Sequence, residues 1–301
     1  MKVAHISDLH IDLNNDNAGT KFGIEFFDKL LSEYSRRPDA AKVLLISGDI
    51  SNSVTQTIAA LDIMSEYFTY VVFVDGNHEY YTDDYHHVVE SRFMDNYDNL
   101  GKVIYLSANN NMFVYKNLIV VGVNGWYDFN APGIGAPEYQ MEHWRQRSSD
   151  ADIEFIDVPS GFRPITPAFN PITQIANRDA EAMRQKFTDL RLAYSYDIVA
   201  MTHTLPKFSM IGQQNGIIPA WAGSMFSSQM EELFDSDCRR QANVKAWCCG
   251  HQHYRQFPVI DGVQISCNPY GYVWKDTCGQ MPYGIFEFES ANPTNYNYFT
   301  L

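Results

Sequence analysis

Short runs of β-branched and apolar residues alternate along this chain with longer segments of helical periodicity. The first of these runs predict strands at Lys2–Ser7, Val43–Ser47 and Val71–Val74. Apolar residues spaced three and four apart predict helices at Phe22–Tyr34 and Val54–Phe68, which separate the strands. This alternation is typical of an α/β fold, in which the carboxyl ends of the strands share one edge of the sheet.

The alternation continues along the rest of the chain, with one interruption. Asp261-Gly262 predicts a hairpin turn between strands at Phe257–Ile260 and Val263–Cys267. The other expected strands are Leu118–Val123, Asp197–Met201, Val244–Cys248 and Gly284–Phe288, and the other expected helices are Asp84–Tyr97, Asn177–Ala193 and Ser227–Phe234.

The interruption spans residues 126–175, which are rich in proline, glycine and aromatic residues. One helix is expected within it, at Pro137–Arg147. Its many large aromatic side chains argue against disorder, and a long irregular segment in a compact domain is usually functional. We therefore interpret it as an ordered lid, and we expect residues 1–301 to form a single domain.

The composition excludes several classes of partner. The chain carries 22 Lys and Arg against 36 Asp and Glu, a formal net charge of −14, which disfavours a nucleic-acid partner. No apolar run approaches the roughly 18 residues of a membrane-spanning helix, so no membrane partner is expected. The N-terminus meets His5 and Asp8 before any secretory apolar segment, which predicts a cytoplasmic location. The five cysteines lack the spacing of a zinc ribbon and are expected to be reduced.

Side chains that bind metals follow five of the predicted strands, each where the strand ends. Asp8 and His10 are two residues apart on an extended chain, so their side chains point the same way. His251 and His253 share that spacing. Because strand ends share one edge of the sheet, all five segments are expected to meet there. The segments are Asp8-Leu9-His10, Gly48-Asp49, Gly76-Asn77-His78-Glu79, Thr202-His203 and Gly250-His251-Gln252-His253.

Each segment taken alone also has a purely structural explanation. A single histidine on a strand, such as His5, is usually a hydrogen-bonded core residue, and His143 could pack within the lid as readily as contact a substrate. Five such segments in sequence order, each at a strand end, are hard to explain by packing alone. The combination therefore favours a shared metal site.

In their order and spacing, these segments resemble the calcineurin-like metallophosphoesterases over residues 3 to about 275. The match is closest to a bacterial and phage group whose motifs stand here as Gly-Asn-His-Glu-Tyr-Tyr at 76–81 and Cys-Asn-Pro-Tyr-Gly-Tyr at 267–272. The resemblance implies an αββα fold of four layers, a β-sandwich of two sheets flanked by helices. It also implies two metal ions that share one carboxylate. The first would be held by Asp8, His10, His253 and Asp49, and the second by Asp49, Asn77, His203 and His251.

The resemblance further implies that His78 is the catalytic histidine near the leaving group and that Glu79 is its neighbour. The chemistry agrees, because two cations roughly 3.5–4 Å apart need an anionic bridge such as Asp49, and water held between them becomes the nucleophile. An unliganded histidine can then protonate the leaving oxygen. Mixed nitrogen and oxygen ligands suit Mn, Fe, Zn or Ni better than Mg or Ca, and the sequence does not choose among these four metals.

Two departures from the family pattern bear on the substrate. The protein Ser/Thr phosphatase branch continues its Gly-Asp into an arginine-containing extension, whereas Asp49 is followed here by Ile50, which argues against phosphoprotein substrates. In the nearest group an arginine commonly precedes the late glycine, and Tyr270 occupies that place here. Candidate substrate contacts are therefore Asn52, Tyr80, Tyr127, Asp128, His143 and Tyr270.

The leading hypothesis is a phosphoesterase with two metal ions that hydrolyses a small phosphate monoester or diester. A nuclease is the alternative enzyme, and the low basicity of the chain counts against it. A non-catalytic scaffold of the same fold would be expected to have lost metal ligands, whereas every expected position is occupied here. The sequence leaves the substrate, the metals and the oligomeric state open.

Overall fold

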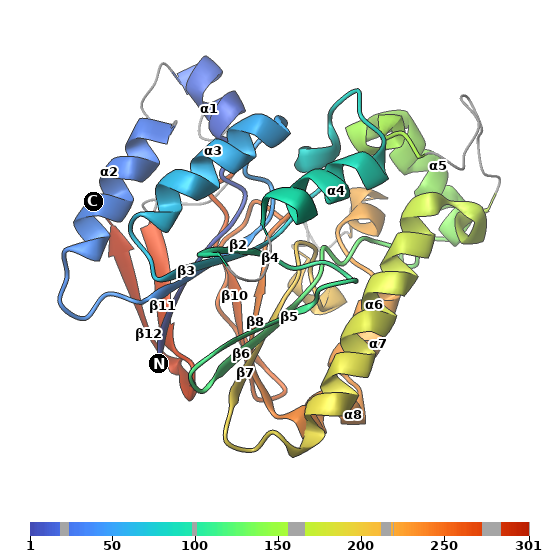
Figure 1. Cartoon of the computed structure of the whole chain (residues 1–301). Coiled ribbons are helices and arrows are strands. Elements are labelled where there is room, and N and C mark those ends of the chain that lie inside the picture. The colour runs from blue at the N-terminus through green and yellow to red at the C-terminus, as the bar shows by residue number, and fades with distance from the viewer. Residues whose placement is uncertain are drawn as a thin grey trace.

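Two six-stranded β-sheets lie face to face, and helices cover the outer face of each sheet (Figure 1). The structure is a computed structural model and describes residues 1–18, 24–97, 101–155, 166–211, 218, 220–272 and 284–300. The layers run helix, sheet, sheet, helix, with one apolar cluster between the sheets and one under the helices on each side. The predicted αββα arrangement is thereby confirmed.

The first sheet contains the N-terminal strands and the last two strands of the chain. Its strands are β1 (Lys2–Ile6), β2 (Val43–Ser47), β3 (Tyr70–Val74), β4 (Val103–Tyr105), β11 (Gly284–Glu289) and β12 (Asn292–Thr300), and its helices are α1 (Ile11–Ala18), α2 (Ile24–Ser35), α3 (Val54–Ser65) and α4 (His86–Asn96). The strand order is β12-β11-β1-β2-β3-β4. Strands β1 to β4 run parallel, and β11 runs antiparallel to both of its neighbours.

The second sheet has a parallel centre and antiparallel edges. Its strands are β5 (Met112–Tyr115), β6 (Leu118–Gly122), β7 (Asp197–Met201), β8 (Val244–Cys249), β9 (Val259–Ile260) and β10 (Val263–Cys267), and its helices are α6 (Pro171–Asp189), α7 (Ser228–Phe234) and α8 (Asp237–Ala242). The strand order is β5-β6-β7-β8-β10-β9. The predicted hairpin is present as the antiparallel pair β9 and β10, and β10 itself runs parallel to β8.

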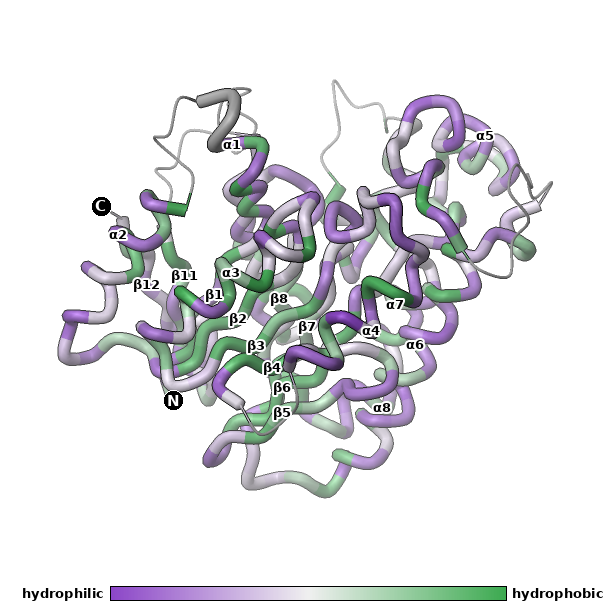
Figure 2. Tube along the Cα trace, turned by 45° about the horizontal axis from the view of Figure 1, so that its top comes forward, coloured by the Kyte–Doolittle hydropathy of each residue, from purple (hydrophilic) through white to green (hydrophobic). Residues whose placement is uncertain are grey.

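Alternate residues of each central strand face opposite layers. Val43 and Leu45 of β2 lie between the two sheets, whereas Leu44 and Ile46 face the helices outside. Both faces of these strands are buried, which explains why they are apolar without interruption. Figure 2 shows the apolar residues concentrated along the strands at the centre and the polar ones toward the outside.

Five elements were not expected from the sequence. They are the helices α1 and α8 and the strands β4, β5 and β12. The three strands are all at an edge of their sheet. Strands β4 and β5 are apolar but only three and four residues long, and β12 is largely polar and exposed, so their sequences resemble those of loops.

The predicted lid at 126–175 is partly helical. It contains α5 (Pro137–Arg147), which has the expected bounds, and its residues 156–165 lie outside the described residues. Helix α6 starts at Pro171, earlier than expected, because the Asn170 side chain accepts a hydrogen bond from the Ile172 amide (2.9 Å) and caps the helix. Short 3₁₀ helices are η1 (His78–Tyr80), η2 (Ser149–Asp152), η3 (Pro167–Phe169), η4 (Leu190–Leu192), η5 (Phe208–Met210) and η6 (Ala220–Ser224).

The sequence predicts reduced cysteines and no membrane-spanning helix. Within the described part of the chain, no helix combines the length and the apolar character that crossing a membrane requires. Cys278 lies outside the described residues. The described cysteines form no disulfide with one another, and they are Cys238, Cys248, Cys249 and Cys267.

Helix α6 is expected to contribute strongly to stability through Phe187, which is fully buried with its ring 6.2 Å from that of Trp247 on β8. Phe187→Ala should lower the free energy of unfolding by about 3–5 kcal/mol, because it leaves a cavity between the helix and the sheet. Leu192→Ala is the matched control, since Leu192 is 68% exposed and should cost less than about 0.5 kcal/mol. Urea unfolding measures both values, and equal losses would contradict this packing.

Candidate metal centre

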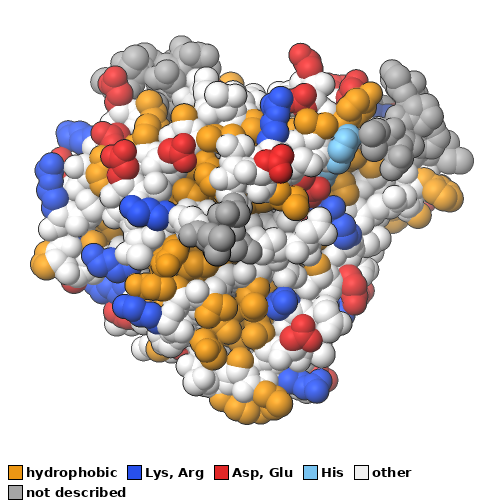
Figure 3. Space-filling model, in the orientation of Figure 1, with side chains coloured by type: hydrophobic (Ala, Val, Ile, Leu, Met, Phe, Trp, Pro, Cys, Tyr) orange, Lys and Arg blue, Asp and Glu red, His pale blue; other side chains and the backbone are white. Residues whose placement is uncertain are grey.

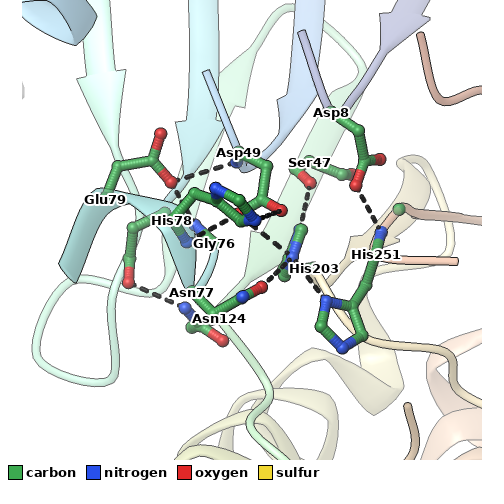
Figure 4. Close-up of polar contacts among 12 residues, drawn as sticks. Asp8, Ser47, Asp49, Gly76, Asn77, His78, Glu79, Asn124, His203 and His251 are labelled. Atoms are coloured by element: carbon green, nitrogen blue, oxygen red, sulfur yellow. Dashed lines mark hydrogen bonds and ion pairs between the residues drawn. The ribbon is translucent and has the colours of Figure 1, made fainter. Parts of the chain in front are cut away.

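The segments that follow the central strands of both sheets converge at one edge, as expected (Figure 4). They pair with one another beyond the strand ends: the Asp8 amide donates to the Gly48 carbonyl (3.0 Å), and the Gly250 amide donates to the His203 carbonyl (2.8 Å). These bonds fix the loops of β1 and β2 against each other in the first sheet, and those of β7 and β8 in the second. The functional side chains are therefore carried by backbone that is itself hydrogen-bonded.

Four of these polar residues have left-handed backbone conformations. The φ angles are 53° at Asp8, 43° at His10, 57° at Asp49 and 65° at His251. Residues other than glycine rarely adopt positive φ, and each such residue carries a conformational cost that the surrounding structure has to offset. Gly48, with φ of 76°, has no such cost, and a Cβ there would meet the Gly76 amide nitrogen at 2.6 Å. Backbone strain at these four residues therefore accompanies the placement of their side chains at one site.

One group of possible metal ligands consists of Asp8, His10, Asp49 and His253. The Nε2 atoms of His10 and His253 are 3.0 Å apart. Asp8 Oδ1 lies 3.5 Å from His253 Nε2, and Asp49 Oδ2 lies 3.8 Å from His10 Nε2. All four residues offer a ligand atom within 4.8 Å of the others, which suits a single cation.

A second group consists of Asp49, His203 and His251, so Asp49 belongs to both groups. Asp49 Oδ1 lies 3.3 Å from His203 Nε2, and His251 Nδ1 lies 3.1 Å from the same nitrogen. Asn77 Oδ1 is 3.0 Å from His203 Nε2 and adds an amide oxygen. The structure thus brings together all seven residues that the sequence analysis assigned to metal binding.

Hydrogen bonds on the far side of two rings show that these nitrogens suit a cation. His203 donates from Nδ1 to the Ser47 carbonyl (2.7 Å), and His251 donates from Nε2 to the Ser224 carbonyl (2.7 Å). The nitrogens that face each other therefore both have lone pairs available, as metal-ligating histidines do. Their separation is about that of neighbouring ligands at roughly 2.1 Å from one ion. Asp8 Oδ2 is buried and has no hydrogen-bond donor among the described residues, which also fits a cation.

His78 lies beside the two groups and belongs to neither. Its Nδ1 donates to Asn52 Oδ1 (2.7 Å), and its Nε2 lies 3.1 Å from the Tyr272 hydroxyl oxygen. The Nε2 atom is 4.0 Å from Asp49 Oδ2. Asn52 therefore holds the histidine with Nε2 toward the centre, where it could donate a proton to a bound molecule.

Glu79 lies beneath the site. Its carboxylate is buried and accepts hydrogen bonds from four backbone amides, as Figure 4 shows in part. Because the donors belong to the loops after β2 and β3, Glu79 ties these two loops together. It is placed to position Asp49 rather than to touch a substrate. The amide donors are Asp49 (3.0 Å), Ile50 (2.6 Å), Ser51 (3.2 Å) and Gly76 (2.7 Å).

A cavity of about 330 Å³ opens over both groups. Its floor is made by ligand residues and His78, and its walls come from the loop after β3, η2, η6 and the loop after β10. Several wall residues are aromatic or polar. The described wall residues are Tyr81, Ser148, Asp150, Trp221, Ser224, Met225, Gln252 and Tyr272.

Three of the six expected substrate contacts are buried away from the cavity. The Tyr80 hydroxyl donates to Asp75 (2.6 Å), because in a 3₁₀ helix residues three apart share a face and Tyr81, not Tyr80, lies beside His78. Asp128 accepts from the amide at the start of α7 (3.0 Å) and acts as a cap. Tyr270 packs its ring 4.7 Å from that of Phe27.

The other two lid candidates also differ from expectation. Tyr127 is fully buried, and its hydroxyl donates to Asp150 (2.5 Å) behind the cavity wall. His143 is half-buried on α5 and is not among the described residues that line the cavity. Two of the six candidates contact residues of the site: Asn52 bonds His78, and the ring of Tyr127 stacks on that of His251, with 6.4 Å between their centroids.

Sequence reasoning missed several wall residues for different reasons. Tyr81 and Tyr272 lie in the two motifs already quoted, so a signal was present. Asp150 and Ser224 lie in segments without strand or motif, and nothing in the sequence distinguishes them. Packing alone brings these two residues to the centre.

A sequence model described as calcineurin-like phosphoesterase matches residues 1–255. The chain belongs to the calcineurin-like phosphoesterase family. Phosphopantetheinyl hydrolase from Mycobacterium tuberculosis has a similar fold, with a TM-score of 0.64 at 16% identity over 91% of each chain. GAP50, the anchor in the inner membrane complex of Plasmodium, aligns at a TM-score of 0.49 and 10% identity over 100% of this chain and 89% of its own. No curated protein matches the sequence.

Burial and Asp49 set the protonation of the ligands in this family member. Burial lowers the pKa of His10 well below its usual value and lowers that of His251 to about 4, so both rings are neutral and able to bind a cation. Burial also opposes the charge on His203, but the Asp49 carboxylate outweighs it and raises the pKa of His203 to about 10. Without a metal, His203 therefore holds a proton against Asp49.

This ion pair predicts how the stability of the metal-free phosphoesterase depends on pH. A histidine in the unfolded chain has a pKa near 6.5, and that of folded His203 is about 10, so between these values the folded state binds the extra proton. The free energy of unfolding should therefore fall as the pH rises from about 6.5 toward 10. Urea unfolding of chelator-treated protein at stepped pH measures this slope.

The control for this slope is His203→Gln, which should lose stability at neutral pH and show a flatter profile. Addition of Mn²⁺ should flatten the wild-type profile as well, because a cation then takes the place of the proton. A variant with the same slope as the wild type would show that another group titrates.

Proposed function

We propose that this family member is a metal-dependent phosphoesterase that uses two ions to hydrolyse a small phosphate ester. The observation that carries the proposal is the sharing of Asp49 between two groups of ligands, with Oδ2 near His10 (3.8 Å) and Oδ1 near His203 (3.3 Å). Two adjacent cations need such an anionic bridge. The nitrogen and oxygen ligands suit Mn, Fe, Zn or Ni.

The size of the cavity and the charge of the chain support a small substrate. A volume of about 330 Å³ is at the lower end of small-molecule sites. The net charge is −14, and on the face shown in Figure 3 the basic side chains are interspersed with acidic ones rather than gathered into a stripe. A long polyanion would gain little from such a surface. A phosphate monoester or diester of a small molecule is the substrate class we propose.

Two bound cations would activate a water molecule and neutralise the phosphoryl oxygens in the transition state. The residues of the chain would position the ions and the substrate and donate the proton. Asp49 fixes the spacing of the two positions, and Glu79 holds the loop that carries Asp49. His78 directs Nε2 toward the leaving oxygen and donates the proton, while Asn52 prevents its ring from turning. The Tyr272 hydroxyl lies against the same nitrogen, and the leaving oxygen of the substrate would replace it there.

Asp49→Ala and His78→Ala should each lower kcat/KM for an aryl phosphate ester by about 10²-fold or more, the former through lost metal and the latter through lost proton transfer. His87→Ala is the matched control, because His87 is exposed on α4 and should retain full activity. Circular dichroism checks that each variant is folded. Full activity in either site variant would overturn the assignment.

The role of His78 makes a separate prediction about leaving groups. If His78 protonates the leaving oxygen, His78→Ala should cost more with phenyl phosphate, whose leaving group is basic, than with 4-nitrophenyl phosphate. Asn52→Ala should show the same trend with a smaller loss, because the ring remains but is no longer held. Steady-state rates with a series of aryl esters measure this dependence, and a uniform loss would assign His78 to binding alone.

The alternatives are tested with the same protein. Rapid cleavage of single-stranded or duplex oligonucleotides with Mn²⁺ would favour a nuclease over a phosphoesterase for small molecules. A wild-type protein that takes up no divalent metal on titration would favour a non-catalytic scaffold.

A further inference from the structure

A buried carboxylate from the lid segment contacts the candidate metal centre. Asp150 lies in η2 and is 3% exposed. Its Oδ1 accepts from Asn77 Nδ2 (2.9 Å) and from the Tyr81 hydroxyl (2.5 Å). Its Oδ2 accepts from the Tyr127 hydroxyl (2.5 Å). The carboxylate is thus fully engaged, and none of the proposed chemistry uses it.

These bonds determine which end of the Asn77 amide faces the centre. One Nδ2 hydrogen is donated to Asp150 and the other to the Tyr81 hydroxyl (2.8 Å), which in turn donates to Asp150. Both Asp150 oxygens accept from tyrosine hydroxyls, and the amide likewise presents its NH₂ group to this acceptor. The Oδ1 atom is then left toward His203 Nε2 at 3.0 Å, as a metal ligand requires.

We propose that Asp150 is a positioning residue that fixes the orientation of Asn77 and thereby sets the affinity of the metal position on the His203 side. This inference rests on the proposed function, because it assumes that the Asp49, His203 and His251 group holds an ion. The Asp150 carboxylate hydrogen-bonds Asn77, Tyr81 and Tyr127, and among the described residues it forms no hydrogen bond with the other metal position, formed by Asp8, His10, Asp49 and His253.

The lid holds Asp150 firmly enough for this role. Ser148 Oγ accepts from the Asp150 amide (3.2 Å) at the start of η2. Trp144 of α5 donates from Nε1 to the Tyr127 hydroxyl (2.6 Å), and this hydroxyl reaches Asp150. The chain of hydrogen bonds therefore runs from helix α5 through Tyr127 and Asp150 to Asn77.

The same outer layer also orients His251. Its Nε2 donates to the carbonyl of Ser224 in η6, and η6 packs closely on α5, since a Cβ on Gly223 would lie 2.6 Å from Gln140 Oε1. Two ligands of one metal position thus depend on segments outside both sheets. The position formed with His10 and His253 relies on the strand ends.

The test is calorimetric titration of chelator-treated protein with Mn²⁺ alone. The wild type should take up two equivalents. In Asp150→Ala the equivalent on the His203 side should bind about 10–100-fold more weakly, as for other groups that orient metal ligands, while the other is unchanged. Asp150→Asn, which can still accept one hydrogen bond, should show a smaller loss. Asp152→Ala is the matched control, because Asp152 is an exposed acid of the same short helix.

The outcomes separate this inference from the proposed function. Two equivalents bound equally tightly by the wild type and by both Asp150 variants would overturn the role of Asp150 and leave the phosphoesterase standing. Fewer than two equivalents in the wild type would overturn both. If Asp150→Ala does not fold by circular dichroism, Tyr81→Phe replaces it, since it removes one acceptor of the Asn77 amide and keeps the ring; unchanged affinity there would count against the inference.

Discussion

The site depends on buried carboxylates placed among imidazole nitrogens at the edge where the two sheets meet. Asp8 and Asp49 are almost completely buried, and the facing nitrogens of His203 and His251 are 3.1 Å apart. Burial of uncompensated charge and of facing lone pairs is costly, so this cluster needs a cation or, without one, a proton on His203. The strained backbone at the ligands follows from the same requirement.

Around this cluster, the fold supplies two levels of support. The loops after the central strands hold the ligands directly, and Glu79 binds those loops from below through four backbone amides. The lid and η6 act from outside, through the hydrogen bonds of Asp150 to Asn77 and of Ser224 to His251. The inner support is common to both metal positions, and the outer support concerns one of them.

Much of the fold could be predicted because the central strands are apolar on both faces and the main helices are amphipathic. The edge strands β4, β5 and β12 could not, since β4 and β5 are only three and four residues long and β12 is largely polar and exposed. The early start of α6 depends on a cap at Asn170 that falls within an irregular segment. The single-domain organisation and the catalytic roles stay predictions.

The sequence by itself predicted which side chains would meet at the candidate metal centre, because each follows an apolar strand and strand ends share an edge. Tertiary structure decided which neighbouring side chains face the cavity. Tyr81 faces it and Tyr80 does not, since Tyr81 lies three residues after His78 and shares its face of the 3₁₀ helix. Asp150 reaches Asn77 across 73 residues of chain. Such contacts come from the packing of segments that are distant in the sequence, and local periodicity does not predict that packing.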